Sequence, residues 1–159
     1  MAKRMDAIKL LKDDHKTVRE LLKRLTASKI INEELFKKIK KELTIHTKIE
    51  EEIFYPAFKN AVNTQEGREL FYEAHEEQEL VDYLISKMGG EKNQDVFSAK
   101  AKILKELVGH HAHEEESEMF PKARKAMGKD QLLDLGWKMS ERKAELQEER
   151  KLFPGLKIE

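Results

Sequence analysis

The chain has 159 residues, no cysteine, and 31 basic against 31 acidic side chains, so its formal net charge is zero. The length is that of one domain with a single core, and the missing cysteines exclude disulfides, zinc–thiolate sites and iron–sulfur clusters. Balanced, interspersed charges give no general attraction to nucleic acid or to an anionic membrane. No apolar run approaches the roughly 20 residues that span a bilayer, and the N-terminus lacks the apolar segment of a signal peptide, so we expect a cytoplasmic protein.

Five segments carry apolar residues at helical spacing. They run from about Met5 to Ala27, Asn32 to Val62, Thr64 to Met88, Asn93 to Met127 and Asp130 to Lys151. Asn32 is a good N-cap residue, and glycines at 89–90 and at 128 are typical helix stops. Pro56 and Pro121 each fall late in a long helix, where a kink or a local irregularity is expected.

No stretch alternates apolar and polar residues over the length of a strand, and short connections make consecutive helices antiparallel neighbours. We therefore predict an all-α fold, an up-down-up-down four-helix bundle with an additional C-terminal helix. Residues 1–128 form the bundle in this prediction. Residues 129–159 form the extra helix and a short tail containing Pro154 and Gly155, within the same domain.

The sequence also contains an internal repeat. An offset of 65 residues places His46 on His111, Glu50 on Glu115, Glu51 on Glu116, Pro56 on Pro121 and Ala61 on Ala126, and an offset of 60 places His15 on His75. Each half is thus a helical hairpin with a histidine on its first helix and an H-x-x-x-E pair on its second.

Six potential metal ligands lie on or beside the apolar stripes: His15, His46, Glu50, His75, His111 and Glu115. Each alone would usually be a hydrogen-bonded core histidine or a solvated carboxylate. Together they favour a metal centre, because residues four apart share one helix face and the pattern occurs twice. Imidazole and carboxylate ligands without sulfur suit two carboxylate-bridged first-row ions. Iron is the leading candidate and manganese the next, and a zinc pair accounts less well for so many ligands.

The same residues lie in segments that resemble hemerythrin-like proteins with the HHE cation-binding motif. The segments are DDHKTVRELL (13–22), HTKIEEEIFYP (46–56), EAHEEQELVDYLI (73–85), HHAHEEESEMFP (110–121) and LLDLGWKMSERKAEL (132–146). The resemblance implies a four-helix bundle with a non-haem di-iron centre that reacts with dioxygen or related small molecules. It also implies that the six residues above are the ligands, with both glutamates bridging. No glutamate precedes a histidine by three residues, which argues against ferritin-like relatives.

Two positions remain open. His110 and Glu114 form a second H-x-x-x-E pair, although the spacing to proline favours His111, and His113 is expected at the surface or behind a ligand. Glu79 stands where dioxygen-carrying hemerythrins have a fifth histidine, which argues against simple dioxygen carriage. Three roles are open for Glu79: it completes the coordination of a metal ion, forms a hydrogen bond to a water ligand, or lies exposed.

We therefore expect a protein that binds or reacts with dioxygen, peroxide or nitric oxide, without nucleic acid or membrane as a partner. One alternative is an enzyme that disproportionates peroxide or reduces nitric oxide at the same centre, recognised by turnover rather than by a long-lived oxygenated form. Another is an iron- or oxygen-responsive binding module, whose fifth helix contacts a partner. A tyrosine such as Tyr55, Tyr72 or Tyr83 could donate a hydrogen bond at the centre, and spacing places none of them.

Overall fold

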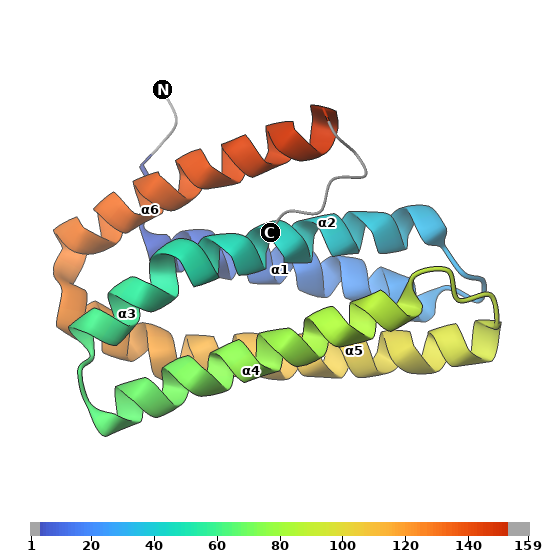
Figure 1. The fold of residues 1–159 in the computed structure, drawn as a ribbon, viewed down its shortest axis with the longest axis horizontal. Helices are drawn as coiled ribbons and strands as arrows, with labels where there is room; N and C mark the ends of the chain where they lie inside the picture. Colours follow the sequence, from blue (N-terminus) through green and yellow to red (C-terminus); the bar gives the residue numbers. More distant parts are fainter. Residues whose placement is uncertain (1–3, 153–159) are drawn as a thin grey trace.

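The computed structural model describes residues 4–152, and all the elements in that range are helical (Figure 1). They are α1 (Ala7–Ala27), α2 (Glu33–Ile49), the π-helical turn η1 (Glu50–Phe54), α3 (Tyr55–Ala61), α4 (Gln65–Met88), α5 (Gln94–Glu114), the π-helical turn η2 (Glu115–Met119) and α6 (Phe120–Leu152). Helix α1 packs against α2 and α5, and α4 packs against α5. The predicted all-α bundle is confirmed, and the tail containing Pro154 lies outside the described residues.

Polar caps explain where the helices begin. The side chain of Asp6 accepts a hydrogen bond from the backbone N–H of Lys9 at 2.7 Å, and Asn32 and Thr64 cap α2 and α4 in the same way. Such caps satisfy N–H groups that have no partner within the helix. Helix α4 ends at Gly89, and the following Gly90 has a φ of 79°, a left-handed conformation that favours glycine.

The two prolines that predicted an irregularity each follow a π-helical turn. In η1 the N–H of Tyr55 bonds to the carbonyl of Glu50, five residues back, and in η2 the N–H of Phe120 bonds to Glu115 in the same way. Proline has no N–H to donate and crowds the preceding turn, so a helix changes its bonding pattern there most easily. The predicted long helices therefore each contain a single widened turn.

Helix α6 bends at Gly128, whose φ of 74° is not helical, at the residue predicted to end the fourth helix. Its first part continues the bundle, and its second part returns as an outer layer over α1 and α2 (Figure 1). The apolar residues of this second part pack into the core beside Ile8 and Leu11. They are Leu132, Leu135, Met139 and Leu146.

A polar layer separates two apolar clusters inside the bundle. One cluster holds Leu11, Ile49 and Met119 together with the packed face of α6, and the other holds Val18 and Leu43. The polar side chains buried between them are Asp14, His15, His46, Glu50, Gln78, His111 and Glu115. The fold thus places its buried ionisable groups in one layer, shielded by apolar side chains at both ends.

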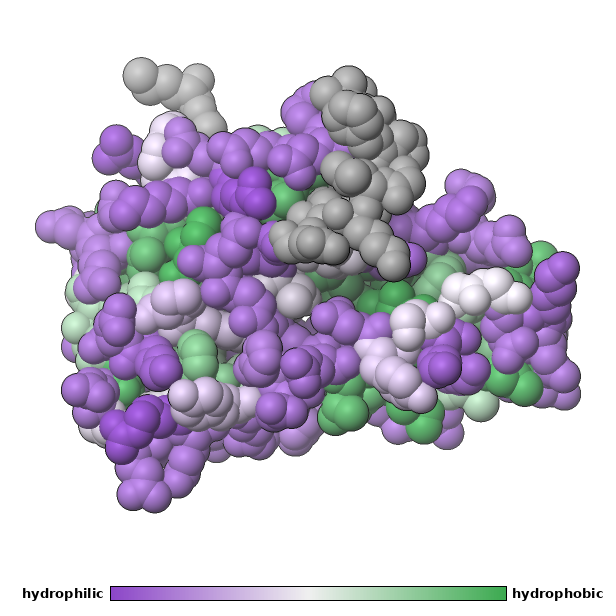
Figure 2. Space-filling view, viewed as in Figure 1, coloured by the Kyte–Doolittle hydropathy of each residue, from purple (hydrophilic) through white to green (hydrophobic). Residues whose placement is uncertain are grey.

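Hydrophilic residues cover most of the molecular face in Figure 2. None of the helices in residues 4–152 combines the length and the apolar composition that a membrane span requires.

The close approach of α6 to the start of α1 gives a test of the fold. A Cβ atom at Gly136 would lie 2.0 Å from the carbonyl oxygen of Met5, so Gly136→Ala forces the two segments apart. We expect this substitution to lower the free energy of unfolding by about 1–3 kcal/mol, measured by chemical denaturation. Gly109→Ala is the control, because nothing lies within 4 Å of its new methyl group, and it should raise stability by roughly 0.5–1 kcal/mol. Equal effects would show that α6 does not pack this closely.

Candidate metal centre

Five side chains from three parts of the bundle converge in the polar layer. His15 comes from α1, His46 and Glu50 from the end of α2 and the start of η1, and His111 and Glu115 from the end of α5 and the start of η2. All five have relative exposures between 0 and 7%. Each helical hairpin of the repeat therefore delivers its H-x-x-x-E pair to the same point.

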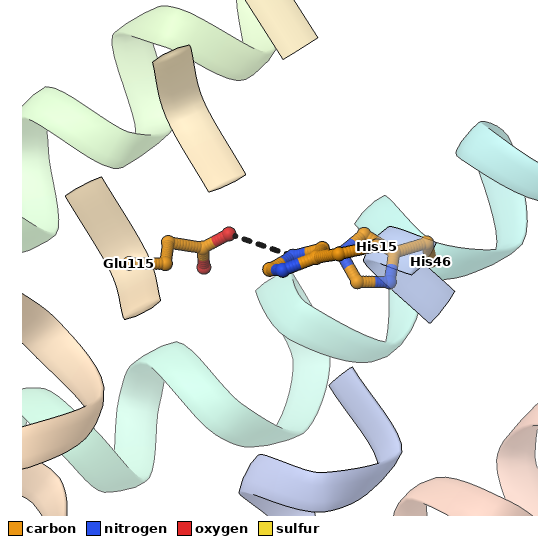
Figure 3. Close-up of side chains that lie close together, drawn as sticks. All are labelled: His15, His46 and Glu115. Carbon is orange, nitrogen blue, oxygen red and sulfur yellow. Dashed lines mark ion pairs between the residues drawn. The ribbon is translucent and has the colours of Figure 1, made fainter. Parts of the chain in front are cut away.

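The imidazoles point their Nε2 atoms at the two carboxylates. The Nε2 atom of His46 lies 2.7 Å from Glu50, and those of His15 and His111 lie 3.3 Å and 3.2 Å from the same oxygen of Glu115. Figure 3 shows the Glu115 carboxylate directed at His15 and His46. The Nε2 atoms of His15 and His46 lack hydrogen-bond geometry despite these short distances. Imidazole nitrogens and carboxylate oxygens that face one another without hydrogen bonds have the arrangement expected of ligands around a shared metal ion.

Carboxylates face the opposite nitrogen of all three rings. Asp14 accepts from Nδ1 of His46 at 3.0 Å, and Glu77 from Nδ1 of His111 at 3.2 Å. Glu116 faces Nδ1 of His15 at 3.5 Å without forming a hydrogen bond. Histidine ligands of metals characteristically have such a carboxylate behind them, which fixes the ring and leaves Nε2 free for the metal.

The converging atoms divide into two groups of three that share one residue. Each group supplies donor atoms within 4.8 Å of one another, one from His15, His46 and Glu115 and the other from Glu50, His111 and Glu115. One oxygen of each glutamate also has no hydrogen-bond partner. A buried carboxylate oxygen without a partner is costly, and a cation would satisfy it. The residues therefore fit metal cations, and Glu115 would belong to both groups of ligands.

The buried acidic and imidazole groups of this layer shift one another's pKa values. Burial opposes ionisation of Glu50, yet His46 and its other neighbours hold the pKa of Glu50 down at about 2. Burial also disfavours a charged His111, but Glu115 and Glu77 raise its pKa to about 9. Burial and the charge of Glu50 raise the pKa of Glu115. The centre thus holds protons that a metal ion would displace.

Tyr55 and Gln78 complete the layer. The Tyr55 hydroxyl donates to Glu115 at 3.1 Å, lies 3.2 Å from Nε2 of His111 and accepts from the amide of Gln78 at 3.1 Å. Gln78 also donates to Glu50 at 3.2 Å. Burial and the two glutamates raise the pKa of Tyr55 well above its usual value, so the phenol keeps its proton as a donor. Tyr72 and Tyr83 are more than half exposed and lie outside the layer.

A cavity of about 30 Å³ adjoins the donor atoms. Its polar walls include His15, His46, Glu50, Gln78 and His111. Its apolar walls are Val18, Leu43, Val81, Val108 and Ala112. A cavity needs about 10–15 Å³ to hold one water molecule, so this cavity suits a molecule of very few atoms.

The structure does not bring His75 to this cluster. The His75 side chain is 41% exposed and contacts Glu51 at 2.8 Å and Glu79 at 3.4 Å, and Glu79 is itself 63% exposed. The residue of α4 that enters the layer is Gln78, because Ala74, Gln78 and Val81 form the buried face of that helix. Among the open roles of Glu79, exposure at the surface is the one that the structure shows.

The burial of His110 and His111 agrees with the spacing to Pro121, which favours His111. His111 is buried beside Glu115, whereas His110 is 62% exposed and contacts Glu77 and Glu114. His113 is exposed on the outside of α5. Of the two H-x-x-x-E pairs in this helix, the one favoured by the sequence is the one in the core.

Sequence reasoning missed the roles of Asp14, Glu77 and Gln78. Asp14 directly precedes His15, and Gln78 lies four residues after Ala74 and three before Val81, which is the spacing of a single helix face. The position of Tyr55 depends on η1. In a π-helical turn, residues five apart lie nearly above one another, whereas an α-helix of 3.6 residues per turn would rotate Tyr55 about 140° from Glu50.

A family model described as the hemerythrin HHE cation binding domain matches residues 6–123. A crystal structure of a hemerythrin HHE cation binding domain-containing protein from Mycobacterium kansasii superposes with a TM-score of 0.79 at 26% sequence identity, covering 93% of this chain and 91% of that one. No curated protein sequence matches the chain significantly.

The carboxylate behind His46 gives a test of the centre. Asp14→Asn keeps the side-chain shape but removes the charge that orients the imidazole, so the affinity for a metal ion should fall about 10- to 100-fold in competition with a chelator. Asp13→Asn is the matched control, because Asp13 is half-exposed and pairs only with Lys9 in the described structure. If Asp13→Asn and Asp14→Asn lower the affinity equally, Asp14 does not support the centre.

Proposed function

Because this chain belongs to the hemerythrin HHE cation binding family, we propose that it holds two iron ions in the polar layer and binds dioxygen or a related small molecule beside them. The observation that carries the proposal is the convergence of three imidazoles and two carboxylates into two buried groups that share Glu115. These groups open onto a cavity too small for an organic substrate.

The donor atoms favour iron. Nitrogen and oxygen ligands without sulfur suit iron, manganese and zinc, and iron is the one among them that commonly exchanges electrons with dioxygen, peroxide or nitric oxide. Each group offers only three protein residues, fewer than a six-coordinate ion takes. Water and the small molecule would fill the remaining positions.

The cavity supports the choice of ligand. Pockets for drug-sized organic molecules measure about 300–1,000 Å³, roughly ten times or more the volume of this one. Its apolar walls exclude bulk water, and its polar walls are the proposed metal ligands. A diatomic molecule fits both the size and the position.

Catalytic turnover of peroxide or nitric oxide is a second candidate, and Tyr55 favours it. Reduction of nitric oxide takes up protons together with electrons from an external reductant, and disproportionation of peroxide moves protons between two peroxide molecules without consuming any. The Tyr55 hydroxyl, which contacts His111 and Glu115, is placed to pass a proton in either reaction. Glu79 is a solvated residue on α4 and therefore does not weigh against dioxygen carriage. Rapid loss of peroxide with iron-loaded protein would favour the enzyme, and a long-lived oxygenated spectrum would favour carriage.

Iron stoichiometry tests the proposed ligands. Chain purified from iron-replete cells and dialysed against a weak chelator should retain two irons. His46→Ala and His111→Ala should each retain fewer, because each removes a buried donor. His110→Ala is the control, since its side chain lies outside the layer, and it should keep both irons. Equal iron content in His110→Ala and His111→Ala would refute the assignment of His111.

A substitution that fills the cavity tests small-molecule binding. Val108→Leu adds one carbon at an apolar wall without touching a proposed ligand. The affinity of the reduced, iron-loaded protein for nitric oxide should fall roughly tenfold or more, while its iron content stays unchanged. Val96→Leu makes the same change at an exposed position of α5 and should have no effect. Unchanged nitric oxide binding in Val108→Leu would place the ligand elsewhere.

A further inference from the structure

A second group of potential ligands lies on the outer side of α4 and α5. It consists of Glu77 on α4 and of His110 and Glu114 on α5, with one donor atom from each residue within 4.8 Å of the others. The Nε2 atom of His110 lies 3.2 Å from Glu114 and 3.4 Å from Glu77. One imidazole and two carboxylates therefore meet at one point.

This surface group has the same composition as one of the buried groups. His110 and Glu114 are four residues apart on one helix, as His111 and Glu115 are, and Glu77 supplies the carboxylate from a neighbouring helix, as Glu50 does for the buried group. Residues four apart present their side chains at the same place on a helix. Helix α5 therefore carries two ligand pairs, one turned to the core and the other, one residue earlier, turned outward.

The charge of the surface group is not neutralised by basic residues. Among the side chains that the structure describes, no lysine or arginine forms an ion pair with Glu77 or Glu114, and the partners of these carboxylates are His110 and His111. Two carboxylates and an imidazole within this distance can coordinate a cation. Nitrogen and oxygen donors of this kind suit a first-row divalent ion whose other positions are filled by water.

The group is also accessible from solvent. The side chain of His110 is 62% exposed, and those of Glu114 and Glu77 are 24% and 18% exposed, whereas those of the buried donors are 10% or less. A hydrated ion can therefore reach these atoms without any opening of the bundle. We propose that His110, Glu77 and Glu114 form a second, solvent-facing site for a divalent metal ion, distinct from the buried centre.

Manganese binding to the iron-loaded protein tests this site. Mn²⁺ binds such ligands more weakly than Fe²⁺, so it should not displace the buried iron. Titration followed by electron paramagnetic resonance should show one bound Mn²⁺ per chain, with the iron content unchanged. His110→Ala and Glu114→Gln should each weaken Mn²⁺ binding at least about tenfold. His113→Ala, which removes an exposed histidine from the same helix, should leave it unchanged.

A further variant separates the two sites. His46→Ala damages the buried centre but leaves the surface residues intact, so it should still bind Mn²⁺ with an affinity that depends on His110. Absence of Mn²⁺ binding by the wild type, or binding that His110→Ala and Glu114→Gln leave unaltered, would overturn the proposal. Circular dichroism of each variant would confirm that its helices are intact. Failure of the iron proposal would appear separately, as missing buried iron in a chain that still binds manganese at the surface.

Discussion

Two ionisable carboxylates, Glu50 and Glu115, lie almost entirely out of water at the middle of the bundle. Moving a charged carboxylate out of water costs several kcal/mol. Charged or hydrogen-bonding groups around it have to offset that cost. Three imidazoles supply the nearest partners, and outer carboxylates hold the rings in place. Helix α6 extends this arrangement to the surface, because Lys143 bonds to Asp14 behind His46. The polar layer and the outer helix are thus parts of one system of compensating charges.

The apolar clusters on either side of the layer make this system rigid. Close-packed side chains resist displacement, so ligand atoms held between them keep their spacing. The low polarity of the surroundings also strengthens every charge interaction inside the layer. Phe120 illustrates both effects, because its ring stacks on His15 with an interplanar angle of 9° and shields the imidazole from solvent. The apolar core therefore fixes the geometry of the polar layer as well as stabilising the bundle.

Periodicity and spacing predicted the bundle, the irregularities at the prolines and the burial of His15, His46, Glu50, His111 and Glu115. These features depend on local rules, since residues four apart share a helix face wherever the helix packs. The place of His75 could not be derived in this way, because it depends on the rotation of α4 about its own axis. That rotation depends on the packing of the whole helix, and it buries Ala74, Gln78 and Val81 while leaving His75 at the edge. Glu77 and Lys143 were missed for a related reason, because their partners are distant in sequence.

The widened turns η1 and η2 occupy equivalent places in the two halves of the repeat, and the residue that follows each turn is aromatic. The equivalent residues are Tyr55 and Phe120, and each contacts a buried polar residue of the opposite half: Tyr55 bonds to Glu115, and Phe120 stacks on His15. A nearly twofold-symmetric backbone therefore surrounds an asymmetric interior, with a hydroxyl on one side and a hydrocarbon ring on the other. An ion held by His111 would have a hydroxyl close by, whereas an ion held by His15 would have a hydrocarbon ring, so the two ends of the layer would give a bound cation different surroundings.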